Sequence, residues 1–213
     1  MRWRQADPGS RCMTATIRLA RAADGPALAA IYRPAVSEAA ISFEMEPPGA
    51  GEMAARVERN LRHAPWIVCE SQGSVIGYAY ASRHRDRAAY QWSVDVSAYV
   101  APMARRSGVA RALYRSLFAI LVLQGFRNAY AGITLPNAAS IGLHEAMGFT
   151  NVGVYPRVGY KQGSWHDVVW LERTLAPHCP DPPSPKPLPE ILDRQEFRDA
   201  LASGVKLLRL PTG

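Results

Sequence analysis

The sequence lacks several features that would place it in a specialised class of protein. It has 213 residues but three cysteines, Cys12, Cys69 and Cys179, which lie far apart. Such thiols do not form a disulfide framework or a zinc knuckle, and they are typical of a reducing compartment. No run of eighteen apolar residues is present, which argues against a membrane-spanning helix. We therefore expect a cytoplasmic protein with no metal and no membrane partner.

The charge pattern lacks the basic blocks that many nucleic-acid-binding proteins carry. The net charge is +7, yet the arginines are scattered and no basic amphipathic helix stands out. A nucleotide-like cofactor and an acidic substrate explain this charge at least as well as a polymer of phosphates does, so we expect no nucleic-acid partner. No apolar segment follows the charged start Met1–Arg4, and we expect no secretory signal.

The composition that is present is that of a globular domain followed by a segment of another kind. The chain is 48% hydrophobic and 20% charged, which is sufficient for a sizeable core. We divide it into a flexible extension (1–15), a folded domain (16–176), a proline-rich linker (177–189) and a helical tail (190–213). The tail is too short to fold alone, so it packs on the domain or on another subunit, or it stays mobile.

Periodicity predicts an α/β fold. Apolar residues alternate with polar ones in some segments and recur at three- and four-residue steps in others. The predicted strands are 16–20, 65–70, 75–82, 93–100, 128–134, 151–160 and 164–175, and predicted helices begin near residues 24, 52, 108 and 137. Asp24 is expected to cap the first helix. This order predicts a mixed sheet with helices on both faces, in which the strands at 93–100 and 128–134 pair in parallel or diverge.

The stretch from Trp92 to Leu121 organises the chain. From Ser93 to Val100, polar residues occupy one face of the predicted strand and apolar residues the other. A short basic turn follows, with Gly108 and Ala110 at its end. Small residues let the backbone approach a ligand closely, and the first N–H groups of a helix have no partners within it. The turn therefore predicts an anion-binding cradle.

A second motif makes this cradle specific. Together with Arg105-x-x-Gly108-x-Ala110, the segment from Asn137 to Phe149 resembles the two acetyl-CoA-binding motifs of the GNAT superfamily of N-acetyltransferases. The segments 92–95, 134–137 and 158–168 are similar to its phosphinothricin N-acetyltransferase branch, and within that branch to the arsinothricin N-acetyltransferases. The likeness spans residues 16–175. It implies a GNAT-like mixed, splayed central sheet with helices on both faces, and it leaves out the linker and the tail.

The resemblance also implies how acetyl-CoA, the co-substrate, is held. Backbone N–H groups of the turn bind the pyrophosphate, and the preceding strand binds the pantetheine arm where two central strands splay apart. The residues implied in these contacts are Tyr99, Val100, Arg105, Arg106, Ser107, Gly108, Val109, Ala110, Asn137 and Ser140. The likeness further implies a homodimer. We expect Trp165, His166 and Asp167 to fix the last hairpin, which in this family often forms a subunit interface.

Asp95 is the residue best suited to take a proton. Acids are depleted in strands, so a polar row in a mid-sheet strand predicts a face that lines a cavity. Amide formation requires an ammonium group to lose a proton, and a carboxylate near the thioester carbonyl is a suitable base. The related enzymes have a glutamate here; because aspartate is one methylene shorter, we favour a water relay. The alternative is a carboxylate hydrogen-bonded within the sheet.

His144 is the second candidate for proton transfer. It falls on one stripe of its predicted helix with Asn137 and Ser140. In most of the superfamily a tyrosine near this position protonates the departing CoA thiolate, and in the branch that this chain resembles a histidine stands there. His144 is therefore expected to act as that acid or to assist in deprotonating the amine. The alternative is a histidine that only caps or packs the helix.

The loop before the Asp95 strand carries the residues expected to select the acceptor. A guanidinium fork suits carboxylate, phosphinate or arsonate oxygens. The resemblance places contacts with substrate oxygens at Arg85 and Arg87, with Tyr90 nearby, and Arg83 belongs to the same set. Phe43, in the first long loop, is expected to pack over the substrate. The simpler alternatives are a solvated charged loop and an ordinary core phenylalanine.

These residues predict an acetyl-CoA-dependent N-acetyltransferase. The expected acceptor is the α-amine of a small acidic amino acid such as phosphinothricin, arsinothricin or methionine sulfone, whose acetylation would detoxify a glutamate mimic. Two alternatives stay open: a peptide or protein N-terminus as acceptor, which requires an open groove, and a non-catalytic acyl-CoA-binding module. Turnover with a panel of amino acids separates the three.

Overall fold

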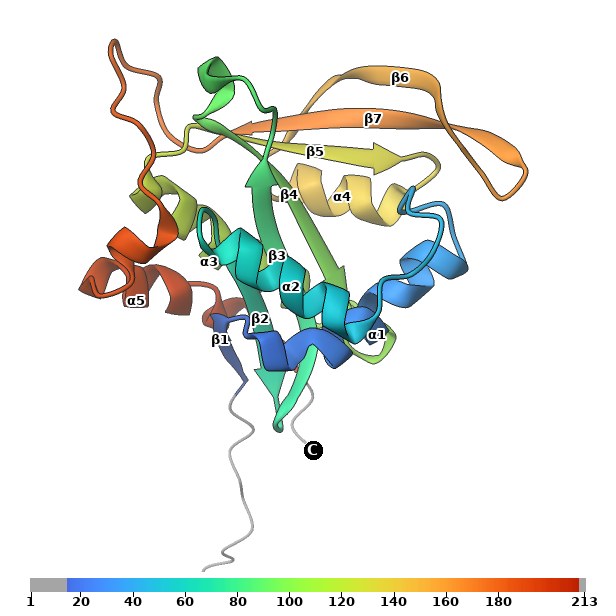
Figure 1. Ribbon diagram of the computed structural model, residues 1–213, viewed down its shortest axis with the longest axis horizontal. Coiled ribbons are helices and arrows are strands. Elements are labelled where there is room, and N and C mark those ends of the chain that lie inside the picture. The colour runs from blue at the N-terminus through green and yellow to red at the C-terminus, as the bar shows by residue number, and fades with distance from the viewer. Residues whose placement is uncertain (1–14, 211–213) are drawn as a thin grey trace, which may run out of the picture.

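A seven-stranded sheet runs through the computed structural model, which describes residues 15–210 (Figure 1). The strands are β1 (Thr16–Leu19), β2 (Trp66–Ser71), β3 (Ser74–Arg83), β4 (Ser93–Val100), β5 (Asn128–Thr134), β6 (Thr150–Lys161) and β7 (Ser164–Thr174). They lie in the order β1-β2-β3-β4-β5-β7-β6. β4 and β5 pair in parallel, whereas the other neighbours pair antiparallel, so the predicted mixed sheet is confirmed. Residues 1–14 of the predicted extension and 211–213 of the tail lie outside the described part.

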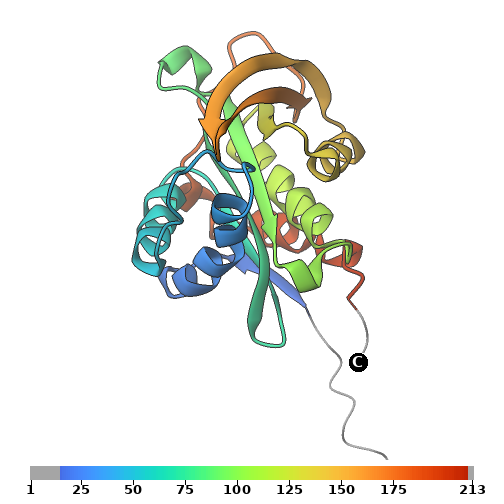
Figure 2. The same ribbon diagram turned by 90° about the vertical axis from the view of Figure 1, so that its right-hand side faces the viewer.

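Helices cover both faces of the sheet. α1 (Gly25–Ser37) and α2 (Ala50–Leu61) lie on one face, and α3 (Val109–Gln124) and α4 (Ala138–Ala146) lie on the other (Figure 2). α5 (Gln195–Ala202) packs beside α3. Short 3₁₀ turns, η1 to η5, cover Ala22–Asp24, Ala88–Tyr90, Pro102–Ala104, Leu188–Ile191 and Val205–Leu207. Between residues 15 and 210, no helix is long and apolar enough to cross a membrane.

Two apolar cores fasten the helices to the sheet. The larger one joins α3 to the sheet at the predicted spacing, through Leu113, Leu117 and Leu121, none of which is exposed. The smaller one joins α1 and α2 to β2 and β3 around Leu28 and Val57. Burying one such side chain contributes about 1.5–3 kcal/mol. The cores therefore hold both pairs of helices at fixed positions beside β4.

α1 begins at the predicted N-cap residue, Asp24, but the bonds of its side chain differ from those of a cap. Asp24 makes no side-chain capping bond to the helix. Its carboxylate instead forms an ion pair with Arg18 at 2.8 Å and accepts a hydrogen bond from the Arg21 backbone N–H at 2.8 Å. The hydrogen bond from Arg18 holds the pKa of Asp24 below its usual value. Asp24 thus ties the beginning of α1 to β1, because the nearby guanidinium offers a stronger, charge-assisted bond than a backbone N–H does.

The proline-rich segment lies along the body of the protein. Residues 175–187 form no helix or strand, as their composition predicts. The Trp92 indole N–H donates to the Pro183 carbonyl at 2.9 Å. The Gln124 side-chain amide donates to the Lys186 carbonyl at 2.8 Å, and the Lys186 N–H donates back to the Gln124 carbonyl at 2.7 Å. These bonds hold the segment against the end of α3.

The tail packs on α3 of the same chain, which decides among its three predicted outcomes. Its apolar residues Ile191 and Phe197 are buried in the larger core, together with Leu188 at the end of the linker. The buried Ser116 hydroxyl of α3 donates to the Leu201 carbonyl at 2.7 Å, and its oxygen accepts from the Gly204 N–H at 3.1 Å. The tail is therefore anchored by both apolar burial and a buried hydroxyl.

Candidate active site

The sheet divides between β4 and β5. The two strands pair over three residues, from Ser93 beside Asn128 to Asp95 beside Tyr130, and then separate. β4 continues alongside β3 as far as Val100, and β5 continues alongside β7. Both predicted alternatives, parallel pairing and divergence, therefore occur. Asp95 stands at the last paired position, where the fork opens.

A narrow slit of about 60 Å³ follows the fork. β4 lines it with residues 96–99 and β5 with residues 131–134, and the helices add Tyr114, Asn137, Ser140 and His144. Because β4 and β5 no longer pair with each other here, their backbone groups can bond a thin chain that carries amides. The slit therefore fits the pantetheine arm. It brings together the predicted residues Tyr99, Asn137 and Ser140.

The predicted anion cradle joins β4 to α3. Arg106 and Gly108 have left-handed backbone angles, with φ of 63° and 82°. A side chain at Gly108 would also collide with the Leu207 carbonyl. The Ser107 hydroxyl donates to the Ala104 carbonyl at 2.6 Å, which closes the turn. This position therefore requires glycine for both its conformation and its space.

The side chains of the turn divide between solvent and core. Arg105 and Arg106 are exposed, whereas Val109 is 1% exposed and packs in the larger core. Val109 can therefore offer a ligand only its backbone N–H. The start of a helix carries partial positive charge, and the two arginines add to it. The turn thus fits the pyrophosphate of acetyl-CoA.

The tail also reaches this turn. The Arg209 backbone N–H donates to the Ser107 carbonyl at 2.8 Å. The Leu207 carbonyl lies against Gly108. Residues 205–210 therefore support the cradle, which no sequence pattern indicated.

His144 belongs to a buried network. The Asn137 side chain begins α4 by accepting from the Ser140 N–H at 3.1 Å. His144 Nδ1 lies 2.8 Å from the Ser140 carbonyl, and its Nε2 lies 2.9 Å from the Tyr114 hydroxyl. Since a carbonyl only accepts, Nδ1 carries the proton and Nε2 accepts from Tyr114. Burial lowers the pKa of His144, which favours this neutral form.

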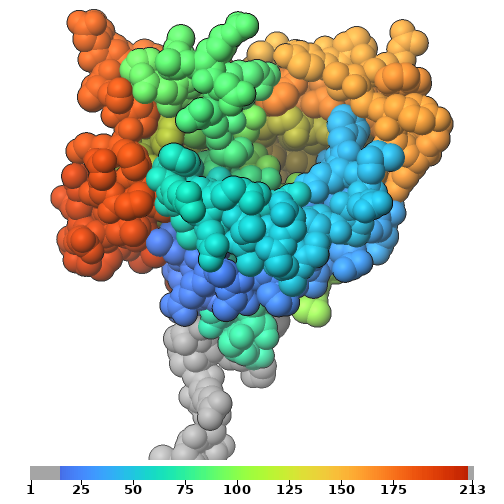
Figure 3. Space-filling model, in the orientation of Figure 1, coloured from blue at the N-terminus to red at the C-terminus, as the bar shows by residue number. Residues whose placement is uncertain are grey.

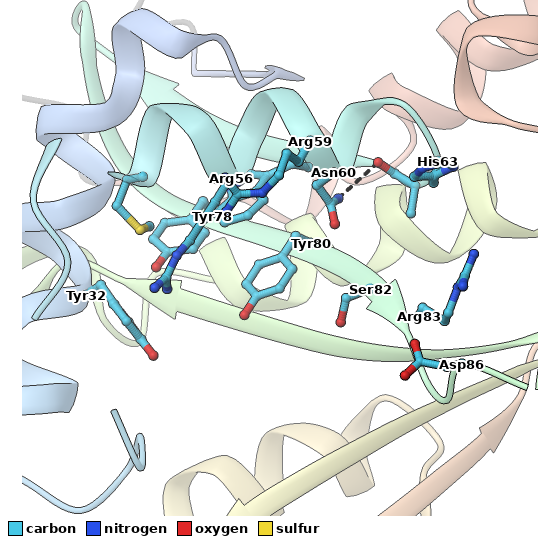
Figure 4. A pocket seen from close by; sticks show the side chains of 13 residues that line it. Tyr32, Arg56, Arg59, Asn60, His63, Tyr78, Tyr80, Ser82, Arg83 and Asp86 are labelled. Carbon is cyan, nitrogen blue, oxygen red and sulfur yellow. Dashed lines mark hydrogen bonds between the residues drawn. The ribbon is translucent and has the colours of Figure 1, made fainter. Parts of the chain in front are cut away.

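A larger hollow of about 700 Å³ lies on the α1–α2 face of the sheet. Figure 3 shows the surface hollowed between α2, in cyan, and the loop after β3, in green. Its lining includes four tyrosine and tryptophan rings and three arginines: Tyr32, Trp66, Tyr78, Tyr80, Arg56, Arg59 and Arg83. Figure 4 shows Ser82, Arg83 and Asp86 at one end and Tyr32 at the other. The hollow is thus both aromatic and cationic.

The three arginines of this hollow differ in how far their charge is compensated. Arg56 donates two hydrogen bonds to the Glu44 carboxylate, at 2.7 and 3.0 Å, and one to Glu52 at 2.9 Å. The bonds from Arg56 hold the pKa of Glu44 below its usual value. Arg59 lies 3.3 Å from Glu52. Among residues 15–210, Arg83 forms no ion pair, so its charge is the most available to an acidic ligand.

The slit and the larger hollow meet at β3 and β4. Tyr80 and Ser82 line the larger hollow, and they pair across the sheet with Ser97 and Asp95. Ser97 lines the slit. Because side chains of directly paired residues point to the same face, Asp95 faces the side of the larger hollow beside Ser82. Asp95 itself lines neither hollow; it lies two residues before Ser97 on β4 and opposite Ser82 across the sheet.

A partner of Asp95 that no sequence pattern indicated is His84. Its Nδ1 lies 2.6 Å from Asp95 Oδ1. The His84 ring stacks on Tyr130 with 4.4 Å between centroids, and the rings of Tyr90 and Trp170 lie at 6.0 and 6.1 Å. The side chains of Asp95 and His84 are 30% and 12% exposed. Burial raises the pKa of Asp95, and the bond from His84 opposes this shift.

The other predicted arginines lie beside this pair. Arg85 donates to the His84 carbonyl at 2.8 Å, and its guanidinium lies 5.6 Å from the centre of the Trp170 ring. Arg87 is exposed at the start of η2. Neither arginine lines the slit or the larger hollow. Arg83 is thus the member of the predicted set that the fold brings to the larger hollow.

Phe43 lies against the last hairpin. Its ring fills the space beside Gly159, and it lies 6.2 Å from the His166 ring. The buried Lys161 ammonium fastens this loop by donating to three backbone carbonyls at 2.6–2.7 Å, those of Val36, Ser42 and Glu44. Phe43 lines neither the slit nor the larger hollow, and its packing over a substrate stays a prediction.

The hairpin itself is held by the residues predicted to fix it. His166 Nε2 lies 3.0 Å from the Lys161 carbonyl, and the Asp167 carboxylate accepts from the Arg157 N–H at 2.7 Å. The outer strand exposes a row of large apolar side chains, including Val152, Val154, Tyr155, Val158 and Tyr160. Trp165 of β7 is 61% exposed beside them.

Among the residues that sequence reasoning missed, Arg56, Arg59 and Tyr114 line the hollows and His84 lines neither. Arg56 and Arg59 share the polar side of α2, and that spacing was the available signal. His84 stands among arginines at the end of a strand, where it read as part of a charged loop. Tyr114 carried no signal, because its position on α3 is that of a core residue. Within residues 15–210, no cluster of His, Cys, Asp or Glu is placed to hold a metal.

Comparison with known proteins identifies a family and several relatives. Residues 17–170 match the family described as an acetyltransferase (GNAT) domain. Phosphinothricin N-acetyltransferase of Streptomyces viridochromogenes is 38% identical over 176 residues, which cover 82% of this chain and 95% of that protein. An L-methionine sulfoximine/L-methionine sulfone acetyltransferase of Pseudomonas paraeruginosa is 34% identical over 167 residues, which cover 78% of this chain and 97% of that protein.

The fold has a close counterpart among solved structures. The crystal structure of a GNAT superfamily phosphinothricin acetyltransferase from Sinorhizobium meliloti, in complex with acetyl-CoA, superposes with a TM-score of 0.73. The two chains are 39% identical, and the match covers 77% of this chain and 90% of that one.

Proposed function

The chain belongs to the GNAT acetyltransferase family and is an acetyl-CoA-dependent N-acetyltransferase, and we propose that it acetylates the α-amine of a small acidic amino acid. The observation that carries this proposal is that two unlike hollows, one small and one cationic, are lined by the paired residues Tyr80 and Ser97, with Asp95 two residues away on β4. Phosphinothricin, arsinothricin and methionine sulfone are acceptors of this kind, and two relatives are named for such substrates. Acetylation removes the positive charge of the amine, which would detoxify a glutamate mimic.

The cofactor side uses mainly backbone groups. We assign the pyrophosphate to the backbone N–H groups of the turn Arg105–Ala110, which is closed by the Ser107 hydroxyl and supported by the tail at Gly108. Tyr99 and Val100 bond the pantetheine arm, and Asn137 and Ser140 border its slit. Acetyl-CoA supplies the activated acetyl group, and these residues hold it with the thioester at the fork.

Asp95 receives the proton that the acceptor must lose. The ammonium gives this proton to the carboxylate, directly or through water, and the freed nitrogen then bonds to the carbonyl carbon of the thioester. The carbon–sulfur bond breaks, and the second proton of the nitrogen passes to the sulfur. A main-chain N–H at the splayed strand stabilises the negative charge that develops on the carbonyl oxygen.

His144 acts through Tyr114 in this proposal. Its Nδ1–H is held by the Ser140 carbonyl and its Nε2 accepts from the Tyr114 hydroxyl, so the neutral ring has no proton directed at the slit. The Tyr114 hydroxyl lines the slit and can relay the proton from nitrogen to sulfur. This geometry favours an assisting role for His144 over that of the acid itself.

The acceptor side uses side-chain charge. We assign the second acid group of the acceptor to Arg83, with Arg59 as a further cation of the same hollow, because Arg56 is already compensated by Glu44. Arg85, Arg87 and Tyr90 border the entrance through the loop after β3, and Phe43 closes the hairpin side.

The assembly and the location are part of the same proposal. The exposed apolar row on β6, with Trp165 beside it, supports a homodimer in which a second copy covers this face. Cys69 and Cys179 are unpaired, which agrees with a cytoplasmic enzyme. We keep 16–176 as the acetyltransferase domain, 177–189 as the linker and 190–213 as the tail.

The proposal is tested by measuring CoA thiol release from acetyl-CoA with phosphinothricin, arsinothricin, methionine sulfone, glutamate and a short peptide. We expect turnover with the first three and none with the peptide, because the cationic hollow takes a second acid group. Turnover with the peptide alone would replace the proposed acceptor by a polypeptide N-terminus. Binding of acetyl-CoA without turnover on any amine would favour a non-catalytic module.

A further inference from the structure

We infer that His84 takes the proton from the acceptor amine, with Asp95 as the carboxylate that orients it; this inference rests on the proposed function. The two side chains form one unit, since His84 Nδ1 and Asp95 Oδ1 are 2.6 Å apart. They come from the loop after β3 and from β4, and the pairing of Ser82 with Asp95 sets them side by side. Nothing in the linear pattern of the chain links them.

The hydrogen bond fixes the tautomer of His84. An ionised carboxylate only accepts, so it requires the proton on Nδ1 and leaves the lone pair on Nε2. Within residues 15–210, the contact found for the His84 ring nitrogens is the one from Nδ1 to Asp95. An imidazole held in this way by a carboxylate is the arrangement in which a histidine serves as a general base. His84 is therefore set up to accept a proton at Nε2.

The ring is also held in place. It stacks on Tyr130 at an interplanar angle of 20°, and the rings of Tyr90 and Trp170 stand nearly perpendicular to it. The charged and titratable groups around it are Asp95 on β4, Arg85 and Tyr90 on the loop, and Tyr130 on β5, whose hydroxyl is bonded to Glu172 of β7. A ring held on three sides loses little freedom when a ligand binds.

The position suits the reaction. Ser82 and Arg83, the two residues before His84, line the larger hollow, and Asp95 directly precedes Val96, the first β4 residue of the slit; the His84–Asp95 pair itself lies just outside both linings. Asp95 alone has a short reach. The imidazole extends that reach by one ring. When Nε2 takes a proton, the Asp95 carboxylate still stabilises the positive charge of the imidazolium. The pair thus replaces the water relay that a lone aspartate would need.

The proton balance is simple. The ammonium N–H bond breaks and an N–H bond forms at His84 Nε2, which gives an imidazolium beside the Asp95 carboxylate. The free amine attacks the thioester carbon, and the second proton of the nitrogen goes to the departing sulfur. The imidazolium then releases its proton to water, so one proton leaves per turnover.

A role limited to orienting Asp95 is the competing explanation, and two substitutions separate them. In His84→Asn the amide nitrogen takes the place of Nδ1 and can still donate to Asp95, but the base at Nε2 is lost. In His84→Phe the stacked ring stays and both nitrogens are lost. Thermal unfolding and the KM for acetyl-CoA show whether each variant is folded with an intact cofactor site.

We expect both variants to lose about 100-fold in kcat/KM for the amino acid, with the KM for acetyl-CoA unchanged. The acid limb of the pH profile should disappear in both, and added imidazole should restore part of the rate of His84→Ala. A His84→Asn enzyme with a wild-type rate and pH profile would overturn the inference and leave His84 as a positioning residue.

An acceptor-independent measurement keeps this test apart from that of the proposed function. In ¹⁵N-histidine-labelled full-length protein, assigned by comparison with His84→Asn, Nε2 of His84 should have the shift of an unprotonated nitrogen, and Asp95→Asn should change it. A protonated Nε2 on a neutral His84 ring would overturn the inference. Failure of every amine to release CoA from the wild type would overturn only the proposed function.

Discussion

The slit and the larger hollow recognise their ligands in different ways. The slit holds about 60 Å³ and is bounded by two strands that have just separated, so unpaired backbone groups of both strands border it together with uncharged polar side chains. The larger hollow holds about 700 Å³ and presents aromatic rings and arginines. The first therefore suits a ligand part that is the same in every relative, and the second suits the part that varies.

This contrast teaches where substitutions act. A backbone contact is changed only by altering chain geometry, whereas a side-chain contact is lost with one truncation. Substitutions near Gly108 should therefore change the KM for acetyl-CoA alone, and substitutions of Arg83 should change the KM for the amino acid alone. Asp95, which lies between them, should change the rate and neither affinity.

The largest expected effect comes from Asp95→Asn. Removal of the charge leaves His84, the proton acceptor, without the carboxylate that orients it and stabilises the imidazolium, so kcat should fall about 100-fold. The KM for acetyl-CoA should stay within about twofold of the wild-type value. Steady-state kinetics with both substrates varied will show this. The matched control is Asp193→Asn, an exposed aspartate before α5. An unchanged kcat in Asp95→Asn would show that Asp95 takes no part in the proton transfer.

Arg83→Ala should raise the KM for the amino acid about tenfold or more, because a charge-assisted hydrogen bond is worth about 1.5–3 kcal/mol. The KM for acetyl-CoA should not move. Arg62→Ala is the control, since Arg62 is exposed and lines neither the slit nor the larger hollow. An equal rise in the KM for the amino acid in both variants would show that Arg83 acts only through the overall charge of the protein.

Gly108→Ala should act on the opposite side. The added methyl group meets the Leu207 carbonyl and a left-handed φ, at a cost of about 1–2 kcal/mol. We expect the KM for acetyl-CoA to rise about tenfold, with the KM for the amino acid unchanged. Isothermal titration with CoA gives the same information without turnover.

The control for Gly108→Ala is Gly51→Ala, where a side chain meets nothing within 4 Å in α2. This second glycine should tolerate alanine with a gain in stability of about 0.5–1 kcal/mol. Equal CoA affinity of the two variants would contradict the role of the turn as the pyrophosphate cradle.

The smallest effect on rate is expected for Tyr114→Phe. The substitution leaves His144 Nε2 without its donor inside the core, and we expect a loss of about 1–3 kcal/mol in the free energy of unfolding. The kcat should fall only a few-fold, because the second proton of the amine can still reach sulfur through water. Chemical denaturation and steady-state kinetics check the two parts separately. A 100-fold loss in kcat at unchanged stability would make Tyr114 the principal acid.

Much of the fold could be predicted because its signals are local. The alternation from Ser93 to Val100 and the apolar spacing of α3 each arise within one element, so the strand and the helix follow from the pattern. Asp24 stands at the N-cap of α1 as predicted, but its side chain makes no capping bond because its partner, Arg18, lies on another element. The place of the tail depended in the same way on Ser116, a buried hydroxyl that a core pattern does not reveal.

The candidate site divides along the same line. The turn at Gly108 and the stripe of Asn137, Ser140 and His144 could be recognised, since spacing along one helix or turn sets their geometry. Arg56 was not found, although its face of α2 is polar, because a charged helical face is usually only solvated. Its ion pair with Glu44 could be found only by folding the loop back over α2.

The sequence by itself determined the order of the elements, the polar face that carries Asp95 and the small residues of the anion cradle. These depend on neighbours a few residues away, where covalent geometry decides which side chains share a face. The tertiary structure decided that His84 meets Asp95, that Arg83 keeps its charge free, and that the tail supports Gly108. Such contacts depend on the register between strands and on the packing of distant segments, which one-dimensional periodicity does not encode.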